Sequence, residues 1–239
     1  MSILEMLRPP SCLRVLVTAG AGGTGAAVAR AFVQAGARVH VCDIDRSALD
    51  RLARDTPGIA GSMADVSDRA DVERVFDDLQ RTLGGLDVLV SSAAIAGPAA
   101  PIEEIDVHGW ERTFAVNVHG AFHVARRAVP LLKASSLAPC LIAIGPSWRA
   151  PSPGGTPQAA SASALAGMMR TLADELGPHG IRVHTILPGV GPAVAEHVAA
   201  FALLLCAPAA HRLTGQSYAL GGAAPAVIRG SRAPPPAAA

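Results

Sequence analysis

Short apolar runs alternate with longer amphipathic or alanine-rich segments along most of this chain. Runs of four to seven apolar, often β-branched residues with turn residues on either side predict buried strands. The strands are expected at Leu13–Thr18, Arg38–Cys42, Ile59–Met63, Leu86–Val90, Leu141–Ile144, Ile181–Leu187 and Ser217–Leu220. Apolar positions at helical spacing predict helices between them. These are expected at Ala26–Gly36, Arg46–Arg54, Asp68–Leu83, Asp106–Lys133, Gln158–Leu176 and Val194–Cys206.

Regular alternation of strand and helix is typical of an α/β fold with a parallel sheet. We therefore predict a Rossmann-like, doubly wound, three-layer architecture in a single domain, with ligands bound at the carboxyl ends of the strands. The expected domain spans 12–222, after an N-terminal extension at 1–11. The last segment, 223–239, is rich in Pro and Ala and is expected to be a disordered tail.

Composition excludes some classes of function. The 239 residues carry a formal net charge of +1 and 3% aromatic residues, so no nucleic-acid partner is expected. No signal peptide or membrane-spanning run is recognisable, and the four scattered cysteines suit reduced thiols, so we expect a cytoplasmic protein without a membrane partner. His119 and His123 have the spacing of a metal pair, but no third ligand accompanies them. A polar helix face is the favoured interpretation, and no metal is expected.

A glycine-rich turn follows the first predicted strand. Such a turn, opening into a helix, lets backbone amides approach a pyrophosphate at the positive end of that helix. The turn residues expected to bind it are Thr18, Gly20, Gly22, Gly23, Thr24 and Gly25. Asp43 ends the second strand about 20 residues later, where a carboxylate accepts hydrogen bonds from an adenosine ribose.

From Leu13 to Gly222 the chain resembles the short-chain dehydrogenase/reductase family. Thr18–Gly25 is similar to its glycine turn, with Ala19 in place of one glycine, and further matches lie at Asp65–Val66, Leu176–Val183 and Leu213–Gln216. The resemblance implies an NAD(H) cofactor, because Asp43 favours NAD(H) over NADP(H). It implies further cofactor-binding residues at Asp65, Val66, Ala93, Pro188 and Gly189. It also implies oligomers formed through the helices at 106–133 and 158–176.

The catalytic pattern of the family is missing. Its members use a Tyr as proton donor or acceptor and a Lys four residues later, which lowers the pKa of the Tyr. The only tyrosine here is Tyr218 and the only lysine is Lys133. One alignment of the helix puts Gln158 and Ala162 at the two positions, and another puts Ala160 and Ala164 there. Of the usual catalytic residues only Ser147 and Asn117 have counterparts, in a vestigial or atypical role.

Two further departures affect the same half of the site. Ser91–Ala94 stands where the family has Asn-Asn-Ala-Gly, and Val190–Ala193 lacks the family's Thr and the long loop that covers the substrate. One hypothesis is therefore a non-catalytic or atypical NAD(H)-binding subunit, in a homo-oligomer or beside an active homologue. The alternative is an active NAD-dependent oxidoreductase that uses non-standard residues for hydride transfer.

Overall fold

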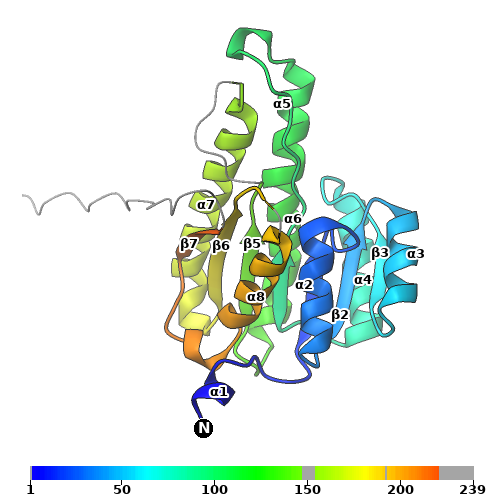
Figure 1. The fold of residues 1–239 in the computed structure, drawn as a ribbon, viewed down its shortest axis with the longest axis vertical. Coiled ribbons are helices and arrows are strands. Elements are labelled where there is room, and N and C mark those ends of the chain that lie inside the picture. The colour runs from blue at the N-terminus through cyan, green and yellow to red at the C-terminus, as the bar shows by residue number, and fades with distance from the viewer. Residues whose placement is uncertain (1, 147–153, 192, 221–239) are drawn as a thin grey trace, which may run out of the picture.

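The structure, a computed structural model, describes residues 2–146, 154–191 and 193–220 (Figure 1). Seven parallel strands form one sheet in the order β3-β2-β1-β4-β5-β6-β7. The strands are β1 Arg14–Thr18, β2 Arg38–Asp43, β3 Ala60–Met63, β4 Val88–Ser91, β5 Cys140–Ile144, β6 Arg182–Pro188 and β7 Gln216–Leu220. The predicted doubly wound α/β fold in a single domain is confirmed.

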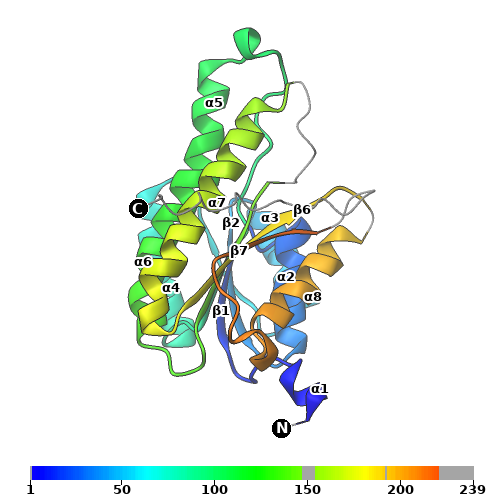
Figure 2. The same ribbon diagram turned by 90° about the vertical axis from the view of Figure 1, so that its left-hand side faces the viewer.

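Helices cover both faces of the sheet, which gives the three layers seen edge-on in Figure 2. Helices α2, α3 and α8 lie on one face, and α4, α6 and α7 lie on the other. The α-helices are α1 Ile3–Met6, α2 Gly23–Gln34, α3 Arg46–Asp55, α4 Arg69–Leu83, α5 Val107–Phe114, α6 Ala121–Lys133, α7 Thr156–Leu176 and α8 Val194–Leu205. Short 3-10 turns lie at Ile102–Glu104, Gly177–His179 and Pro208–Ala210.

Local sequence signals explain where several helices begin and end. The Asp68 carboxylate accepts from the amides of Ala70 and Asp71 at the start of α4, and the Asp45 carboxylate caps α3 in the same way. Helix α4 ends at Gly84, whose φ of +72° is the left-handed conformation that glycine adopts without strain. These caps fix the helices against the strand ends that build the site.

The segment predicted as one long helix at 106–133 contains a π-helical turn. Helix α5 passes through Ala115–Gly120, which is π-helical, into α6. A π turn holds more residues than an α-helical turn, so a search for 3.6-residue periodicity does not find it. Gly120 lies where this turn meets Val66, since a Cβ on Gly120 would be 2.6 Å from Val66 Cγ2. The turn and its glycine bring Asn117 close to the ends of the strands.

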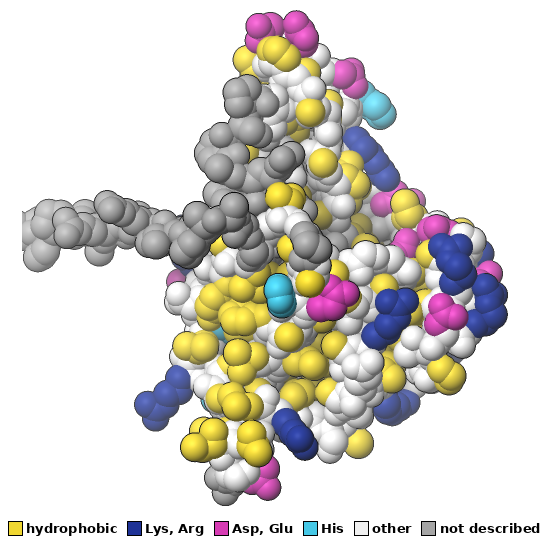
Figure 3. All heavy atoms as spheres, in the orientation of Figure 1, with side chains coloured by type: hydrophobic (Ala, Val, Ile, Leu, Met, Phe, Trp, Pro, Cys, Tyr) yellow, Lys and Arg dark blue, Asp and Glu magenta, His cyan; other side chains and the backbone are white. Residues whose placement is uncertain are grey.

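The two faces of the sheet bury separate apolar cores. One packs Val15, Val17 and Phe32 under α2 and α8, and the other packs Leu16, Leu89 and Leu141 under α4, α6 and α7. Burial on both faces is the pattern expected of parallel strands. Apolar side chains are also gathered on the surface over α8, on the face drawn in Figure 3. Within the described ranges, no helix is long and apolar enough to cross a membrane.

Two parts of the sequence prediction fall outside the described residues. Ser147 lies in 147–153, and the tail at 223–239, together with the domain boundary at Gly222, lies in 221–239. Helix α5 and the first turns of α7 extend side by side beyond the carboxyl edge of the sheet (Figure 1). Residues 147–153 directly precede this end of α7. The projecting helix α5 and the first turns of α7 therefore stand next to the strand ends where the candidate site is found.

Candidate functional site

The glycine turn lies where the strand order reverses. Strand β1 pairs with β2 on one side and with β4 on the other, so the chain extends the sheet from β1 first in one direction and then in the other. This reversal opens a crevice at the carboxyl ends of the strands, where doubly wound sheets bind their ligands. A cavity of about 240 Å³ lies there, lined by residues from the glycine turn and from the ends of β4, β5 and β6. Its walls include Gly22, Thr24, Gly25, Ser92, Gly145 and Pro188.

The glycines of the turn have different roles. A Cβ on Gly20 would lie 2.7 Å from the Val41 Cβ, and one on Gly25 would lie 2.1 Å from the Ala19 carbonyl oxygen. These two glycines let the turn pack on β2 and on itself. At Gly22 and Gly23 a Cβ would meet nothing within 4 Å. That open side is where a bound group can approach the backbone.

Helix α2 presents its N-terminus to this cavity. Its N-cap is Gly22, and no described side chain caps the first turn. The amides there are left for an anion and carry the positive end of the helix dipole. An alanine occupies one strained position of the turn, since Ala19 has φ of +48°, the left-handed region that costs residues other than glycine. The open face of the turn at Gly22 and Gly23, called the cradle from here on, and the uncapped amides fit a pyrophosphate.

Thr18 supports this cradle from behind. Its side chain is fully buried, and its hydroxyl oxygen accepts hydrogen bonds from the amides of Ser92 at 2.9 Å and Ala93 at 3.1 Å. The hydroxyl thus ties the end of β1 to the segment that follows β4. Thr18 therefore shapes the site by holding Ser92 and Ala93, the latter in the wall of a neighbouring cavity.

Asp43 ends β2 beside the turn. Its Oδ2 accepts from the Ala21 amide at 3.0 Å and its Oδ1 accepts from the Asp45 amide at 3.1 Å. Each carboxylate oxygen can accept further hydrogen bonds, because a carboxylate has about four acceptor positions. Two amides thus fix the orientation of the carboxylate and leave acceptor positions to which ribose hydroxyls could donate.

A second cavity, of about 180 Å³, lies beside Asp43 and is mostly apolar. Its lining residues come from the ends of β1, β2, β3 and β4 and from α5 and the π turn. They are Ala19, Asp43, Ile44, Ala64, Asp65, Val66, Ala93, Ala94, Ile95, Arg112 and Val116. Of the predicted cofactor residues, Asp43, Asp65, Val66 and Ala93 thus meet in one cavity, which is suited to a flat base. From here on we call it the base cavity.

Asp65 is held by neighbours within the base cavity. Arg112 donates to its Oδ2 at 2.8 Å, and the Ser67 amide and hydroxyl donate to its Oδ1 at 2.9 and 2.7 Å. Partial burial raises the pKa of the Asp65 carboxyl, but the bonds from Arg112 and Ser67 outweigh burial, and its pKa lies below the ordinary value. Asp65 is therefore a fixed, ionised acceptor near neutral pH.

Asn117 is 1% exposed, and its side chain binds neighbouring parts of the protein. Its Oδ1 accepts from the Ile95 amide at 2.8 Å, while its Nδ2 donates to the Ile95 carbonyl at 2.9 Å and to Ser161 Oγ at 3.0 Å. Asn117 thus joins the segment after β4 to α7. The predicted catalytic role of its side chain stays a prediction, and the contacts observed are structural.

Neither alignment of the missing catalytic pair places a phenol or an amine on α7. Ala162 is buried, and Gln158, Ala160 and Ala164 are half-buried. Tyr218 lies on β7 beside Phe201 of α8, with ring centroids 4.8 Å apart, and Lys133 ends α6 near the amino end of β5. The chain's only tyrosine and only lysine are therefore on different elements, away from the first turns of α7.

The other predicted residues lie on the opposite wall of the crevice. Pro188 lines the larger cavity, and the Gly189 amide donates to the Leu220 carbonyl at 2.6 Å. Only residues 189–193 separate β6 from α8, so the covering segment that the family carries here is short in this chain. Ser147 directly follows Pro146, the last lining residue described on that side.

Sequence reasoning missed Arg112, Ser67, Ile44 and Ile95. The first two hold Asp65, and the last two are apolar walls of the base cavity. Ile44 and Ile95 could have been found, because each lies within a few residues of a predicted strand end. Arg112 could not, since it meets Asp65 across 47 residues of sequence.

Comparison with known proteins agrees with this fold and site. The family model described as Enoyl-(Acyl carrier protein) reductase matches residues 19–192. The chain is 35% identical over 185 residues to the short chain dehydrogenase/reductase dpchG of Colletotrichum higginsianum, covering 73% of this chain and 68% of that protein. The chain belongs to the short-chain dehydrogenase/reductase family, an oxidoreductase family with a nucleotide-binding fold.

Two other proteins support the assignment. L-fucose dehydrogenase of Bos taurus is 31% identical over 180 residues, and the match covers 73% of this chain but only 64% of that enzyme. A dehydrogenase/reductase from Sinorhizobium meliloti 1021 has the same fold, with a TM-score of 0.80 at 27% identity. That likeness covers 91% of this chain and 96% of the solved one. The family and the open cradle together support the binding of a nucleotide cofactor.

Proposed function

We propose that this protein binds NAD(H) and serves as a non-catalytic or atypical subunit of an oxidoreductase assembly. The observation that carries the proposal is a contrast within one crevice. The adenosine side keeps an open cradle and two fixed carboxylates, whereas α7 offers no Tyr and Lys pair in either alignment. A protein of this kind holds the dinucleotide without the family's proton donor.

The choice of NAD(H) over NADP(H) is supported by Asp43. Its carboxylate lines the base cavity, where it can accept hydrogen bonds from both ribose hydroxyls. A 2′-phosphate in the same place would put two or more negative charges beside it. No described basic side chain donates to Asp43; the donors observed are the amides of Ala21 and Asp45.

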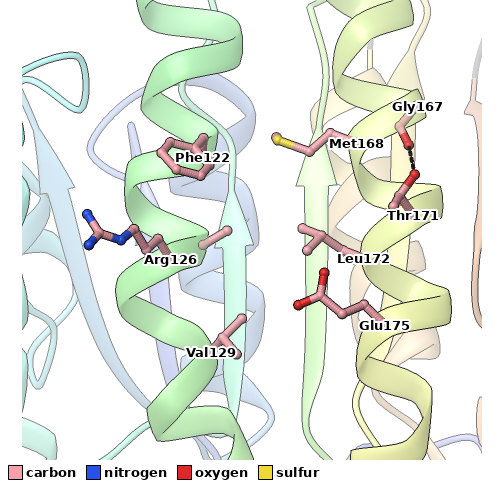
Figure 4. Close-up of a pocket in the computed structure, with 9 residues that line it drawn as sticks. Phe122, Arg126, Val129, Gly167, Met168, Thr171, Leu172 and Glu175 are labelled. Carbon is pink, nitrogen blue, oxygen red and sulfur yellow. Dashed lines mark hydrogen bonds between the residues drawn. The ribbon is translucent and has the colours of Figure 1, made fainter.

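A groove between α6 and α7 supports the subunit role. It has a volume of about 550 Å³, and Phe122, Val129, Met168 and Leu172 line it with apolar groups (Figure 4). Phe122 is 50% exposed, and Arg126 and Glu175 stand at the rim on opposite helices. An apolar groove with charges of both signs at its rim suits an identical face across a two-fold axis. The occupant is a second copy of this chain or a homologous chain.

Calorimetric titration with NADH tests the nucleotide part of the proposal. We expect micromolar binding by the wild type and at least tenfold weaker binding by Asp43→Ala. Asp50→Ala, an exposed acid on α3, is the matched control and should bind like the wild type. Absence of binding at millimolar NADH would refute the proposal that the site binds a nucleotide.

A turnover assay separates the proposal from its alternative, an active NAD-dependent oxidoreductase. Loss of a positioned general acid costs about 10² to 10⁴ in rate, so slow hydride transfer could survive without the tyrosine. The proposal expects no NADH oxidation with a panel of aldehydes and ketones. Measurable oxidation by the wild type that is lost in a Ser147→Ala variant that still folds would instead establish the active enzyme.

Sedimentation tests the assembly. The wild type is expected to form dimers or larger oligomers, and Phe122→Arg is expected to dissociate them because it puts a charge in the apolar groove. Asp174→Arg, an exposed substitution on α7 outside the groove, is the control. A wild type that remains monomeric, alone and with a family member that carries the Tyr and Lys pair, would contradict the subunit role.

A further inference from the structure

An apolar pocket lies at the end of α5 that projects from the sheet (Figure 1). Its volume is about 240 Å³, and it is lined by Ile102, Ile105, Val107 and Trp110. Ile102 is 64% exposed and Val107 is 69% exposed, so most of each side chain meets solvent. Trp110 is half-buried and stacks on Phe114 with ring centroids 4.9 Å apart, which fixes one wall. An exposed apolar hollow of this kind marks a binding surface, and from here on we call it the tip pocket.

The surroundings of the tip pocket are acidic. Four exposed acids stand among its lining residues or next to them in the sequence, namely Glu103, Glu104, Asp106 and Glu111. The one Lys or Arg in 95–117 is Arg112, and its guanidinium is paired with Asp65. The start of α7 beside α5 adds no charge, since 154–169 contains no Asp, Glu, Lys or Arg. Figure 3 shows the acids gathered at this end of the molecule, so the pocket suits an apolar group that is followed by positive charge.

The sequence that follows β7 has this composition. Residues 221–239 contain two arginines, Arg229 and Arg232, and no acid. Val227 and Ile228 come directly before Arg229, and they are the only branched aliphatic residues in that stretch, which otherwise holds Gly, Ala, Pro and Ser. An apolar pair followed by two positive charges is the complement of an apolar pocket with an acidic rim.

The distance to the tip pocket is within reach of this sequence. Strand β7 ends at Leu220, at the same edge of the sheet from which α5 projects. Val116 lines the base cavity at that edge, and at about 1.5 Å per helical residue Val107 stands roughly 14 Å beyond it. Strand β7 is three strands from β4, which is about 14 Å across the sheet. The path is therefore roughly 20 Å, whereas an extended chain from Leu220 to Val227 covers about 23 Å.

We propose that Val227 and Ile228 of the same chain occupy the tip pocket, with Arg229 and Arg232 beside the acids of its rim. Burial of the two aliphatic side chains supplies most of the attraction, because exposed ion pairs contribute little each. The charges decide which segment docks. A segment that is expected to be disordered by itself becomes ordered when it binds in this way. The inference does not depend on nucleotide binding.

Trp110 serves as the reporter in the full chain. The chain has two tryptophans, so Trp148→Phe leaves Trp110 as the only one, and acrylamide quenching then measures how far its ring is covered. In this background, Val227→Asp with Ile228→Asp should raise the quenching constant at least twofold and move the emission to longer wavelength. The matched control places the same two charges further along the segment, as Ala237→Asp with Ala238→Asp, and should leave both quantities unchanged.

An exchange of charges tests the pairing with the rim. Arg229→Glu with Arg232→Glu should raise the quenching of Trp110, and so should Glu103→Arg with Glu104→Arg. All four substitutions together should bring it back toward the starting value, because opposite charges then face each other again. Thermal unfolding checks that each variant folds.

A further control gives the molecule the same net charge at a distant place. Asp50→Arg with Asp55→Arg, both exposed on α3, should not reverse the effect of Arg229→Glu with Arg232→Glu. Quenching of Trp110 that is equal in the Trp148→Phe background and in its Val227→Asp, Ile228→Asp variant overturns the inference, and so does a reversal by the α3 pair.

The dependence on protein concentration identifies the chain that supplies the segment. Protection of Trp110 that is lost on a hundredfold dilution would mean that the segment comes from another copy, and would overturn the assignment to the same chain. Protection that is kept on dilution, lost with the two aspartates and recovered by the exchange of charges establishes the inference. None of these readouts uses NADH, so they stand or fall apart from nucleotide binding.

Discussion

The side-chain amide of Asn117 donates a hydrogen bond from Nδ2 to Oγ of Ser161 at 3.0 Å. Ser161 lies on α7, one residue before Ala162. The same amide group bonds both the amide and the carbonyl of Ile95. A residue that the family resemblance assigns to catalysis thus joins the π turn, the segment after β4 and α7.

We therefore expect Asn117→Ala to destabilise the fold, since it leaves the buried groups of Ile95 without their partner. The free energy of unfolding should fall by about 1–3 kcal/mol. Ser161→Ala removes one bond of the three and should cost about 1 kcal/mol or less. Urea denaturation at neutral pH measures both. Equal stability of Asn117→Ala and the wild type would show that these bonds contribute nothing.

Two glycines of the turn should respond differently to the same substitution. Gly20→Ala puts a methyl 2.7 Å from the Val41 Cβ, so it should lower stability by roughly 1–3 kcal/mol, the range for overpacking. Gly22→Ala meets nothing within 4 Å at a φ of −140°, so the fold should remain. Its methyl instead enters the cradle and should weaken NADH binding at least tenfold. Thermal unfolding and NADH titration of both variants test this; if Gly22→Ala binds NADH normally, the cradle is not used.

Rebuilding the missing pair tests which alignment of α7 is right. If the absent Tyr and Lys are what prevents turnover, Gln158→Tyr with Ala162→Lys should raise NADH oxidation by about 10² or more over the wild type with a suitable carbonyl substrate. The double variant Ala160→Tyr with Ala164→Lys tests the other alignment and serves as the matched control. Gain of activity in the second variant alone would assign the pair to 160 and 164. No gain in either would mean that the short 189–193 segment or the changed Ser91–Ala94 also limits the reaction.

Stability should fall on mild acidification because two histidines are buried. Desolvation lowers the pKa of His40 to about 4, against a smaller opposite effect of Asp78, and burial lowers that of His184 to about 4 as well. The unfolded chain binds protons at these residues below about pH 6.5, whereas the folded protein does so only near pH 4. The stabilisation is thus fully present above pH 6.5 and is lost between pH 6.5 and 4, by at most about 1.4 kcal/mol per pH unit for each histidine.

Urea denaturation at pH 7, 6 and 5 measures this dependence. His40→Gln removes one of the two groups and should reduce the slope by about half. His211→Gln, on an exposed turn, should leave the slope unchanged. His40 also bonds Ser62 and Thr82, so His40→Gln is expected to be less stable at every pH; the slope, not the absolute value, decides. A wild type with constant stability from pH 7 to 5 would contradict the burial of neutral histidines.

The sequence allowed the strands, helices and cradle to be predicted because these depend on local patterns. The strand predicted at Leu13–Thr18 begins one residue before β1, and the helix predicted at Asp68–Leu83 corresponds to α4 together with its N-cap. Apolar runs and capping residues are recognised from nearby residues in the chain, so these bounds could be predicted. The start of α2 at Gly23 differs from the predicted start at Ala26, because glycines with a low helix propensity begin the helix at the cradle.

The contacts that define the candidate site could not be predicted in the same way. The pairs Arg112–Asp65 and Asn117–Ser161 join residues 47 and 44 positions apart, and no periodicity reports such a pairing. The π turn has no separate sequence pattern, and it sets which side of the long helix faces the strand ends. His184 is buried on β6 against the Tyr218 ring of β7, a contact that no local pattern reports.

The strand order also has a consequence for synthesis on the ribosome. Strands β2 and β3 are added first on one side of β1, β4 then pairs with β1 on the other side, and β5, β6 and β7 each pair with the strand made just before. All lining residues of the base cavity lie between Ala19 and Val116, whereas the wall contributed by Ile144 to Pro188 emerges later. The residues of the base cavity are therefore all translated while slightly more than half of the chain is still to come, and the wall of the crevice beside α7 follows later.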